Sequence, residues 1–121
     1  MRLFEREDYL EKIRGFYHDD GVIKVLTGVR RCGKSCLMQT IAEELRAEGI
    51  EGDHIIYLDL DRYGFRSVKT PDQLEALIEP ALKIGGMKYL FIDEVQNVEG
   101  FEGVVNEFRA EGGFSIFITG S

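Results

Sequence analysis

Residues 28–35 read GVRRCGKS, and this short stretch decides how the rest of the chain is interpreted. It places Arg30, Arg31 and Lys34 in a glycine-framed turn, an arrangement that is unfavourable unless an anion normally binds there. The apolar run VIKVLT precedes it, and KSCLMQTIAEELRAEG, with helical periodicity, follows it. A tight turn at the start of a helix binds anions through its free backbone N–H groups. The stretch therefore predicts a strand, an anion-binding turn and a helix in succession.

The same stretch fits G-x-x-x-x-G-K-[ST], the phosphate-binding loop or Walker A motif, in the strand-to-helix context that the motif requires. Gly28 and Gly33 allow a sharp turn whose N–H groups face inward. Lys34 can reach the β- and γ-phosphates, and the Ser35 hydroxyl can ligate a bridging Mg²⁺. The alternative is a glycine-rich turn that binds nothing. The residues expected to bind Mg-ATP here are Gly28, Arg31, Cys32, Gly33, Lys34, Ser35 and Cys36.

Several side chains of the loop allow a second interpretation. Arg30 and Arg31 can be solvated, or they can contact phosphate or an acidic partner. Cys36 can be a small buried residue of the helix. Together with the two histidines, Cys32 and Cys36 form no recognisable zinc spacing. Metal binding by thiols is therefore not expected.

The composition predicts one soluble globular domain over residues 1–121, since 44% of the 121 residues are hydrophobic. We assign residues 1–20 to an N-terminal helical segment and 21–121 to a nucleotide-binding core. The net charge of −7 comes without a basic tract, so direct nucleic-acid binding by this segment is not expected. No apolar stretch approaches the ~20 residues that span a bilayer, and MRLFEREDYL is too charged for a signal peptide. We expect a cytoplasmic protein.

Strands and helices alternate along the chain. Helices are expected at 7–17, from the loop to Gly49, at 70–84 and at 101–110, and strands at 22–27, 55–60, 87–92 and 114–119. Thr70 begins the 70–84 helix as a capping residue, with proline after it and Gln73 completing a capping box. This alternation predicts an α/β fold with a mostly parallel sheet.

The segment KYLFIDEVQN, residues 88–97, ends a buried strand with two adjacent carboxylates. Burying ionised groups is costly without a cation, and Mg²⁺ would supply one. Carboxyl ends of parallel strands share one edge of the sheet, so Asp93 should come near Ser35 and hold the metal as a Walker B aspartate. Glu94 can deprotonate the water that attacks the γ-phosphate, so Lys34 and Glu94 are the expected catalytic residues. The alternative is a solvated turn.

The sequence indicates the roles of the polar residues near these carboxylates less clearly. Gln96 could contact the attacking water or a neighbouring subunit, whereas Asn97 is expected to cap a turn before the 101–110 helix. Asp59 and Asp61 could be outer-sphere groups of the metal, although a solvated strand end is favoured.

The last segment, FSIFITGS, residues 114–121, ends an apolar strand in polar residues. If this strand lies between the 22–27 and 87–92 strands, Thr119, and also Ser121, would approach the γ-phosphate and could sense hydrolysis. A structural turn is the equal alternative.

Taken together, these motifs resemble those of the additional-strand P-loop ATPases, in particular the AAA-type superfamily. The match is closer to prokaryotic ATP-binding proteins with an N-terminal AAA domain and a C-terminal domain of unknown function. It rests on R-x-x-Y-L at 6–10, TGVRR-x-GKS at 27–35, YLFIDEVQN at 89–97 and ITGS at 118–121. The resemblance implies a three-layer P-loop NTPase core, with an adenine pocket near Arg6 and Tyr9.

The resemblance also implies features outside this sequence: a fifth core strand, a second sensor arginine, an arginine finger and the C-terminal domain. We therefore expect a truncated ATPase part with about four strands and the fifth strand missing. The 22–27 strand would then have an unpaired edge, which favours self-association. A strictly monomeric species in light scattering at high protein concentration would contradict that expectation.

Three functions fit these motifs. The leading one is ATP hydrolysis to ADP and phosphate with Mg²⁺ as cofactor. The second is a nucleotide-operated switch or binding module with little turnover. A P-loop kinase is the third, and Glu94 disfavours it because transfer to an acceptor needs no base for water. GTP is not excluded by the loop, but no N-K-x-D guanine-reading motif is present.

Overall fold

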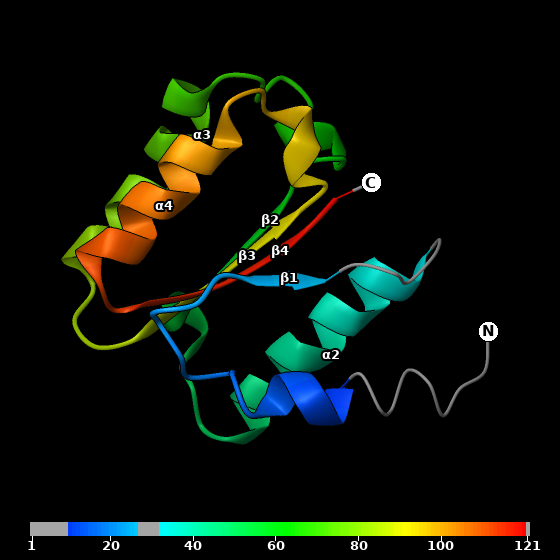
Figure 1. Ribbon diagram of the computed structural model, residues 1–121, viewed down its shortest axis with the longest axis vertical. Helices are drawn as coiled ribbons and strands as arrows, with labels where there is room; N and C mark the ends of the chain where they lie inside the picture. Colours follow the sequence, from blue (N-terminus) through cyan, green and yellow to red (C-terminus); the bar gives the residue numbers. More distant parts are fainter. Residues whose placement is uncertain (1–9, 27–31, 121) are drawn as a thin grey trace.

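The computed structural model describes residues 10–26 and 32–120, with side chains described at 10–26 and 37–120. These residues form a four-stranded sheet in which all three strand pairs are parallel (Figure 1). The strand order is β1-β4-β3-β2, so the last strand in the chain is inserted between the first and the third. This confirms the α/β fold and the insertion. The strands are β1 Lys24–Leu26, β2 Ile55–Asp59, β3 Lys88–Asp93 and β4 Phe114–Thr119.

Helices cover both faces of the sheet (Figure 1). On one face lie α3, Pro71–Ile78, and α4, Phe101–Glu111; on the other lie α2, Cys32–Ala47, and the helical residues 10–14. Short 3-10 segments lie at η1 Gly52–His54, η2 Tyr63–Phe65, η3 Glu79–Lys83 and η4 Val95–Asn97. The result is a helix–sheet–helix sandwich of three layers.

The two central strands are buried at every position, which explains why their sequences are almost continuous apolar runs. Their side chains alternate between two cores. On the α2 face, Phe91 and Phe117 stack with ring centroids 4.7 Å apart and join Leu45 and Tyr17. On the α3–α4 face, neighbouring strand residues such as Leu90 pack against both helices. The sheet is thus held from both sides.

The predicted helix at 70–84 is correct at its start and wrong at its end. Thr70 and Gln73 form the expected capping box, with Pro71 at the first helical position. The α-helix ends at Ile78, however, and a 3-10 segment continues to Lys83. Pro80 has no N–H to donate to the carbonyl four residues earlier, so the α-helical pattern cannot continue through it.

The first strand is shorter than the predicted 22–27, and Thr27 lies outside the described residues. Asp20 accepts a hydrogen bond from the Gly113 N–H at 2.9 Å, which holds the chain before β1 in a turn against the start of β4. Val22 and Val25 are about half exposed. Among the described strands, only β4 pairs with β1. Self-association along its other edge remains a prediction.

Lys24, the first residue of β1, is a buried cation at the amino end of the sheet. Its side chain is 3% exposed, and Nζ donates to the Asp19 carbonyl oxygen and to Ser115 Oγ at 2.8 Å. Nζ also lies 4.8 Å from the centroid of the Phe117 ring. Burial lowers the pKa of Lys24 to about 8, against the opposing charges of Asp19 and Asp20. Lys24 therefore ties the segment before β1 to β4.

This lowered pKa predicts a pH-dependent stability. Below pH 8 the folded protein carries a desolvated charge on Lys24, which costs stability. Between about 8 and the unfolded value of 10.5, the unfolded chain binds a proton that the folded chain has released, so stability rises with pH. We expect the free energy of unfolding in urea to rise from pH 8 to pH 10 relative to the Lys24→Met variant. Parallel pH profiles of the two proteins would contradict this.

The N-terminal residues pack on α2 through a hydrogen-bonded cluster. Arg14 pairs with the Glu44 carboxylate through two N–H groups, at 3.0 and 2.8 Å, and the Tyr17 hydroxyl donates to the same carboxylate at 2.8 Å. Burial and the Glu44 carboxylate raise the pKa of Tyr17. His18 Nδ1 lies 2.6 Å from the Tyr89 hydroxyl oxygen, and His18 Nε2 lies 3.0 Å from Glu48 Oε1. Of the helix predicted at 7–17, residues 10–14 are helical and 15–17 form a turn, while 7–9 lie outside the described residues. The described part packs on α2 and β3.

Within residues 10–26 and 32–120, no helix combines the length and the apolar character needed to cross a membrane.

Candidate active site

Asp93 and Thr119 end neighbouring parallel strands and contact each other at the carboxyl edge of the sheet. Asp93 is 1% exposed and Thr119 is fully buried. The Thr119 hydroxyl donates to Asp93 Oδ1 and accepts the Glu94 N–H at 3.1 Å. One hydroxyl therefore joins both acidic residues to the end of β4.

The strand before the predicted phosphate loop ends at the same edge. Leu26, the last residue of β1, is the register partner of Thr119, which in turn contacts Asp93. Residues 27–31 follow Leu26 directly, and α2 begins at Cys32. The chain that leaves β1 therefore starts one strand away from Asp93, at the edge where nucleotides bind in open α/β sheets.

Much of the predicted loop is not described. Gly28 and Arg31 lie outside the described residues, as does Ser121. For residues 32–36 the helical backbone is described but the side chains are not, so the phosphate and metal contacts assigned to these five residues remain predictions. The five are Cys32, Gly33, Lys34, Ser35 and Cys36.

Glu94 adopts an unusual backbone for a residue with a side chain. Its φ of 59° and ψ of 50° lie in the left-handed region, and among the described residues other than glycine it alone has a positive φ. The conformation turns the chain out of β3 into the 3-10 segment η4. Gln96 Nε2 donates to Glu94 Oε1 at 2.7 Å, so the half-buried carboxylate is held by a neighbour two residues away.

Asn97 was expected from its sequence position to cap the turn before α4, and this prediction is wrong. Its side-chain amide instead donates to the Leu60 carbonyl oxygen at 3.4 Å and to Asp61 Oδ1 at 3.3 Å. The residue before α4 is Gly100, which has no side-chain cap. Asn97 thus joins the turn after β3 to the end of β2, a tertiary contact that local turn preferences do not reveal.

Asp59 ends β2 beside Asp93, its register partner. Its carboxylate accepts the Asp61 N–H at 3.1 Å and lies 3.8 Å from Arg62 Nε. These contacts organise the turn after β2. They do not distinguish between the outer-sphere role and the structural role considered for Asp59.

The oxygen atoms at this edge are of the type that binds a hard divalent cation. Asp93 and Glu94 supply carboxylate oxygens and Thr119 a hydroxyl oxygen, the ligand type that Mg²⁺ takes in proteins. A buried carboxylate at a strand end is also costly without compensating charge or hydrogen bonds. The oxygen atoms at this edge are therefore compatible with the Mg²⁺ predicted from sequence, and the assignment of Asp93 as its ligand remains a prediction.

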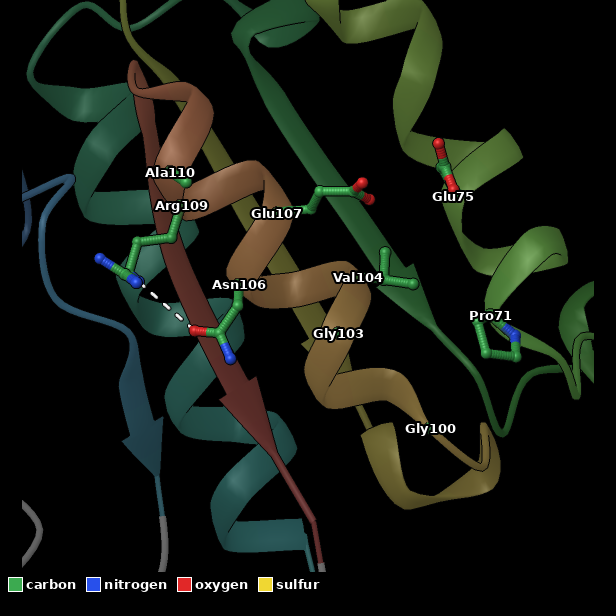
Figure 2. A pocket seen from close by; sticks show the side chains of 9 residues that line it. All are labelled: Pro71, Glu75, Gly100, Gly103, Val104, Asn106, Glu107, Arg109 and Ala110. Carbon is green, nitrogen blue, oxygen red and sulfur yellow. Dashed lines mark hydrogen bonds between the residues drawn. The ribbon is translucent and has the colours of Figure 1, made fainter.

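A shallow groove of about 600 Å³ lies between α3 and α4, away from these residues (Figure 2). Glu75 on α3 and both Gly103 and Glu107 on α4 line it. The Glu107 charge, followed by burial and other nearby carboxylates, raises the pKa of Glu75. None of the predicted site residues lines the groove. We therefore place the candidate active site at the carboxyl edge of the sheet.

Comparisons with known proteins give the family. A family model described as an AAA domain matches residues 20–121. An uncharacterized protein of Haemophilus influenzae is 37% identical over 120 residues, which are 98% of this chain and 30% of that protein. An uncharacterized protein of Methanocaldococcus jannaschii is 37% identical over 100 residues, which are 82% of this chain and 21% of that protein. The chain thus spans less than a third of either relative. No solved structure gives a significant match.

Proposed function

This chain belongs to the AAA-domain family, and from that premise we propose that it binds Mg-ATP and that the intact protein hydrolyses ATP to ADP and phosphate. The observation that carries the proposal is the hydrogen-bonded group of Asp93, Glu94 and Thr119. It lies at the sheet edge reached by the end of β1, where the phosphate-binding sequence begins. Acidic, metal-compatible groups and a phosphate loop at one edge are what nucleotide hydrolysis requires.

In this proposal each residue has a separate task. The backbone of residues 28–33 and the Lys34 ammonium bind the phosphates, while Ser35 and Asp93 hold Mg²⁺. When bound there, Mg²⁺ would supply positive charge to offset the charge of the phosphates. Glu94 accepts a proton from water as the water oxygen bonds to the γ-phosphorus, and the bond to the β–γ bridging oxygen breaks. The protein thus works by positioning groups and proton transfer.

Thr119 supports this arrangement from β4. Its hydroxyl donates to Asp93 and accepts the Glu94 N–H, so a displacement of the strand end would disturb both acidic residues. This coupling is compatible with the sensor interpretation of Thr119 and equally with a structural one. Contact of Thr119 with the cofactor is therefore part of the proposal.

Thermal unfolding with ATP, GTP and Mg²⁺ tests the binding step. A ligand that binds only the folded state raises the free energy of unfolding, by about 2.7 kcal/mol when its concentration is a hundred times Kd. The melting temperature rises as a result. We expect the largest rise with ATP and Mg²⁺ together, and a much smaller rise in Lys34→Ala. Lys83→Ala, at an exposed lysine of η3, is the control and should respond like wild type. An equal melting temperature with and without Mg-ATP would exclude the proposal.

A further inference from the structure

Gln96 lies beside the proposed base and holds its carboxylate. Gln96 Nε2 donates to Glu94 Oε1 at 2.7 Å, a short hydrogen bond to a charged acceptor. The glutamate side chain is otherwise long and flexible, and an unrestrained carboxylate would spend little time in any one position. A carboxylate can accept several hydrogen bonds, so the bond from Gln96 leaves capacity for a water molecule.

The other end of the Gln96 carboxamide lies against the end of β4. A Cβ atom added at Gly120 would lie 2.8 Å from Gln96 Oε1, closer than a Cβ atom approaches another heavy atom, and 3.6 Å from Val95 Cγ1, an ordinary contact. Gly120 directly follows Thr119, whose hydroxyl contacts Asp93 and Glu94. The carboxamide therefore occupies the space between the Glu94 carboxylate and the strand end, and this space exists because residue 120 has no side chain.

From this geometry we infer that Gln96 is a positioning residue for Glu94 and that Gly120 is required for its placement. The inference rests on the proposed function, because it assigns Gln96 a task toward the proposed base. Gln96 keeps one carboxylate oxygen of Glu94 engaged, and the strand end sets where the carboxamide lies. A movement of the end of β4 is thereby transmitted to Glu94 through Gln96 as well as through Thr119.

Kinetics of three variants test the positioning role. Misplacing a reacting group by about 1 Å costs up to about 10²-fold in rate, so we expect Gln96→Ala to lower kcat for ATP roughly 10–100-fold. The Kd for Mg-ATP should stay within about twofold, because the phosphates are bound elsewhere. Gly120→Ala should also lower kcat, since its methyl group displaces the carboxamide. The double variant should be no slower than Gln96→Ala, because the displaced group is then absent.

Gly103→Ala is the matched control for the added methyl group. Gly103 lies on α4, and a Cβ there meets nothing within 4 Å. Its kcat should equal that of wild type. If the fold losses of kcat in the two single variants multiply in the double variant, the positioning role is refuted. An unchanged kcat in Gln96→Ala would refute it as well.

A second readout requires neither nucleotide nor turnover. The side-chain amide resonances of Gln96 in the nucleotide-free protein should shift in Glu94→Ala and in Gly120→Ala, and they should not shift in Gly103→Ala. If they are the same in Glu94→Ala as in wild type, the contact is absent in solution and the inference fails.

The two proposals fail in distinguishable ways. If Glu94→Gln loses turnover while Gln96→Ala keeps it, only the positioning inference is wrong. If Glu94→Gln hydrolyses ATP as fast as wild type, the assignment of the base is wrong, and the inference falls with it even where the amide resonances report the contact.

Discussion

Replacing Glu94 with glutamine is expected to lower ATP turnover by about 10²–10⁴-fold while Mg-ATP still binds. Glutamine keeps the size of the side chain and its capacity for hydrogen bonding, but it cannot accept a proton from water at neutral pH. General-base catalysis contributes a factor of this size in enzymes that use it. Phosphate release measured at saturating ATP gives the rate, and nucleotide titration gives the affinity.

Glu99→Gln is the control for the Glu94 variant, because it removes the same charge from an exposed residue of the next turn. It should hydrolyse ATP at the rate of wild type. Turnover that is barely measurable in wild type itself, with tight binding intact, would instead favour the nucleotide-operated switch. Full activity of Glu94→Gln would exclude Glu94 as the base.

Replacing Thr119 with valine is expected to destabilise the protein by about 1–3 kcal/mol even without nucleotide. Valine has nearly the same shape as threonine but no hydroxyl group. The variant removes the acceptor of the Glu94 N–H and a donor to the buried Asp93 carboxylate. Buried groups that lose a hydrogen-bond partner cost about this much.

Thr119→Ser is the matched variant, since it keeps the hydroxyl and loses only a methyl group. Urea unfolding of both variants and wild type measures the difference. We expect the serine protein to be the more stable of the two variants. The reverse order would mean that packing of the methyl group, and not the hydroxyl, accounts for the contribution of Thr119.

The parts of the fold that the sequence predicted well are those with local signals. The run FSIFIT is apolar because β4 is central and covered on both faces, and its predicted bounds, 114–119, agree with the structure. The start of α3 was predicted from Thr70, Pro71 and Gln73, which interact within one turn. The predicted end is wrong because Pro80 lies within the predicted span and stops the α-helical hydrogen-bond pattern. Local chemistry thus gives a capped helix start and a central strand such as β4 more reliably than a helix end.

The contacts that the sequence could not predict join residues that are distant in the chain. Lys24 stands in the apolar run that forms β1, and its partner Ser115 is 91 residues away. Asn97 has a turn-like context, yet its partner Asp61 lies 36 residues earlier. Gln96 is only two residues from Glu94, but its contact with that carboxylate and its closeness to Gly120 depend on the turn after β3, which the sequence pattern does not show.

The left-handed backbone at Glu94 has a consequence for the folded protein. Only glycine adopts such a conformation without penalty, whereas a residue with a Cβ atom loses roughly 1–2 kcal/mol. The turn that carries the Glu94 carboxylate out of β3 therefore stores backbone strain, which the contacts around it must offset.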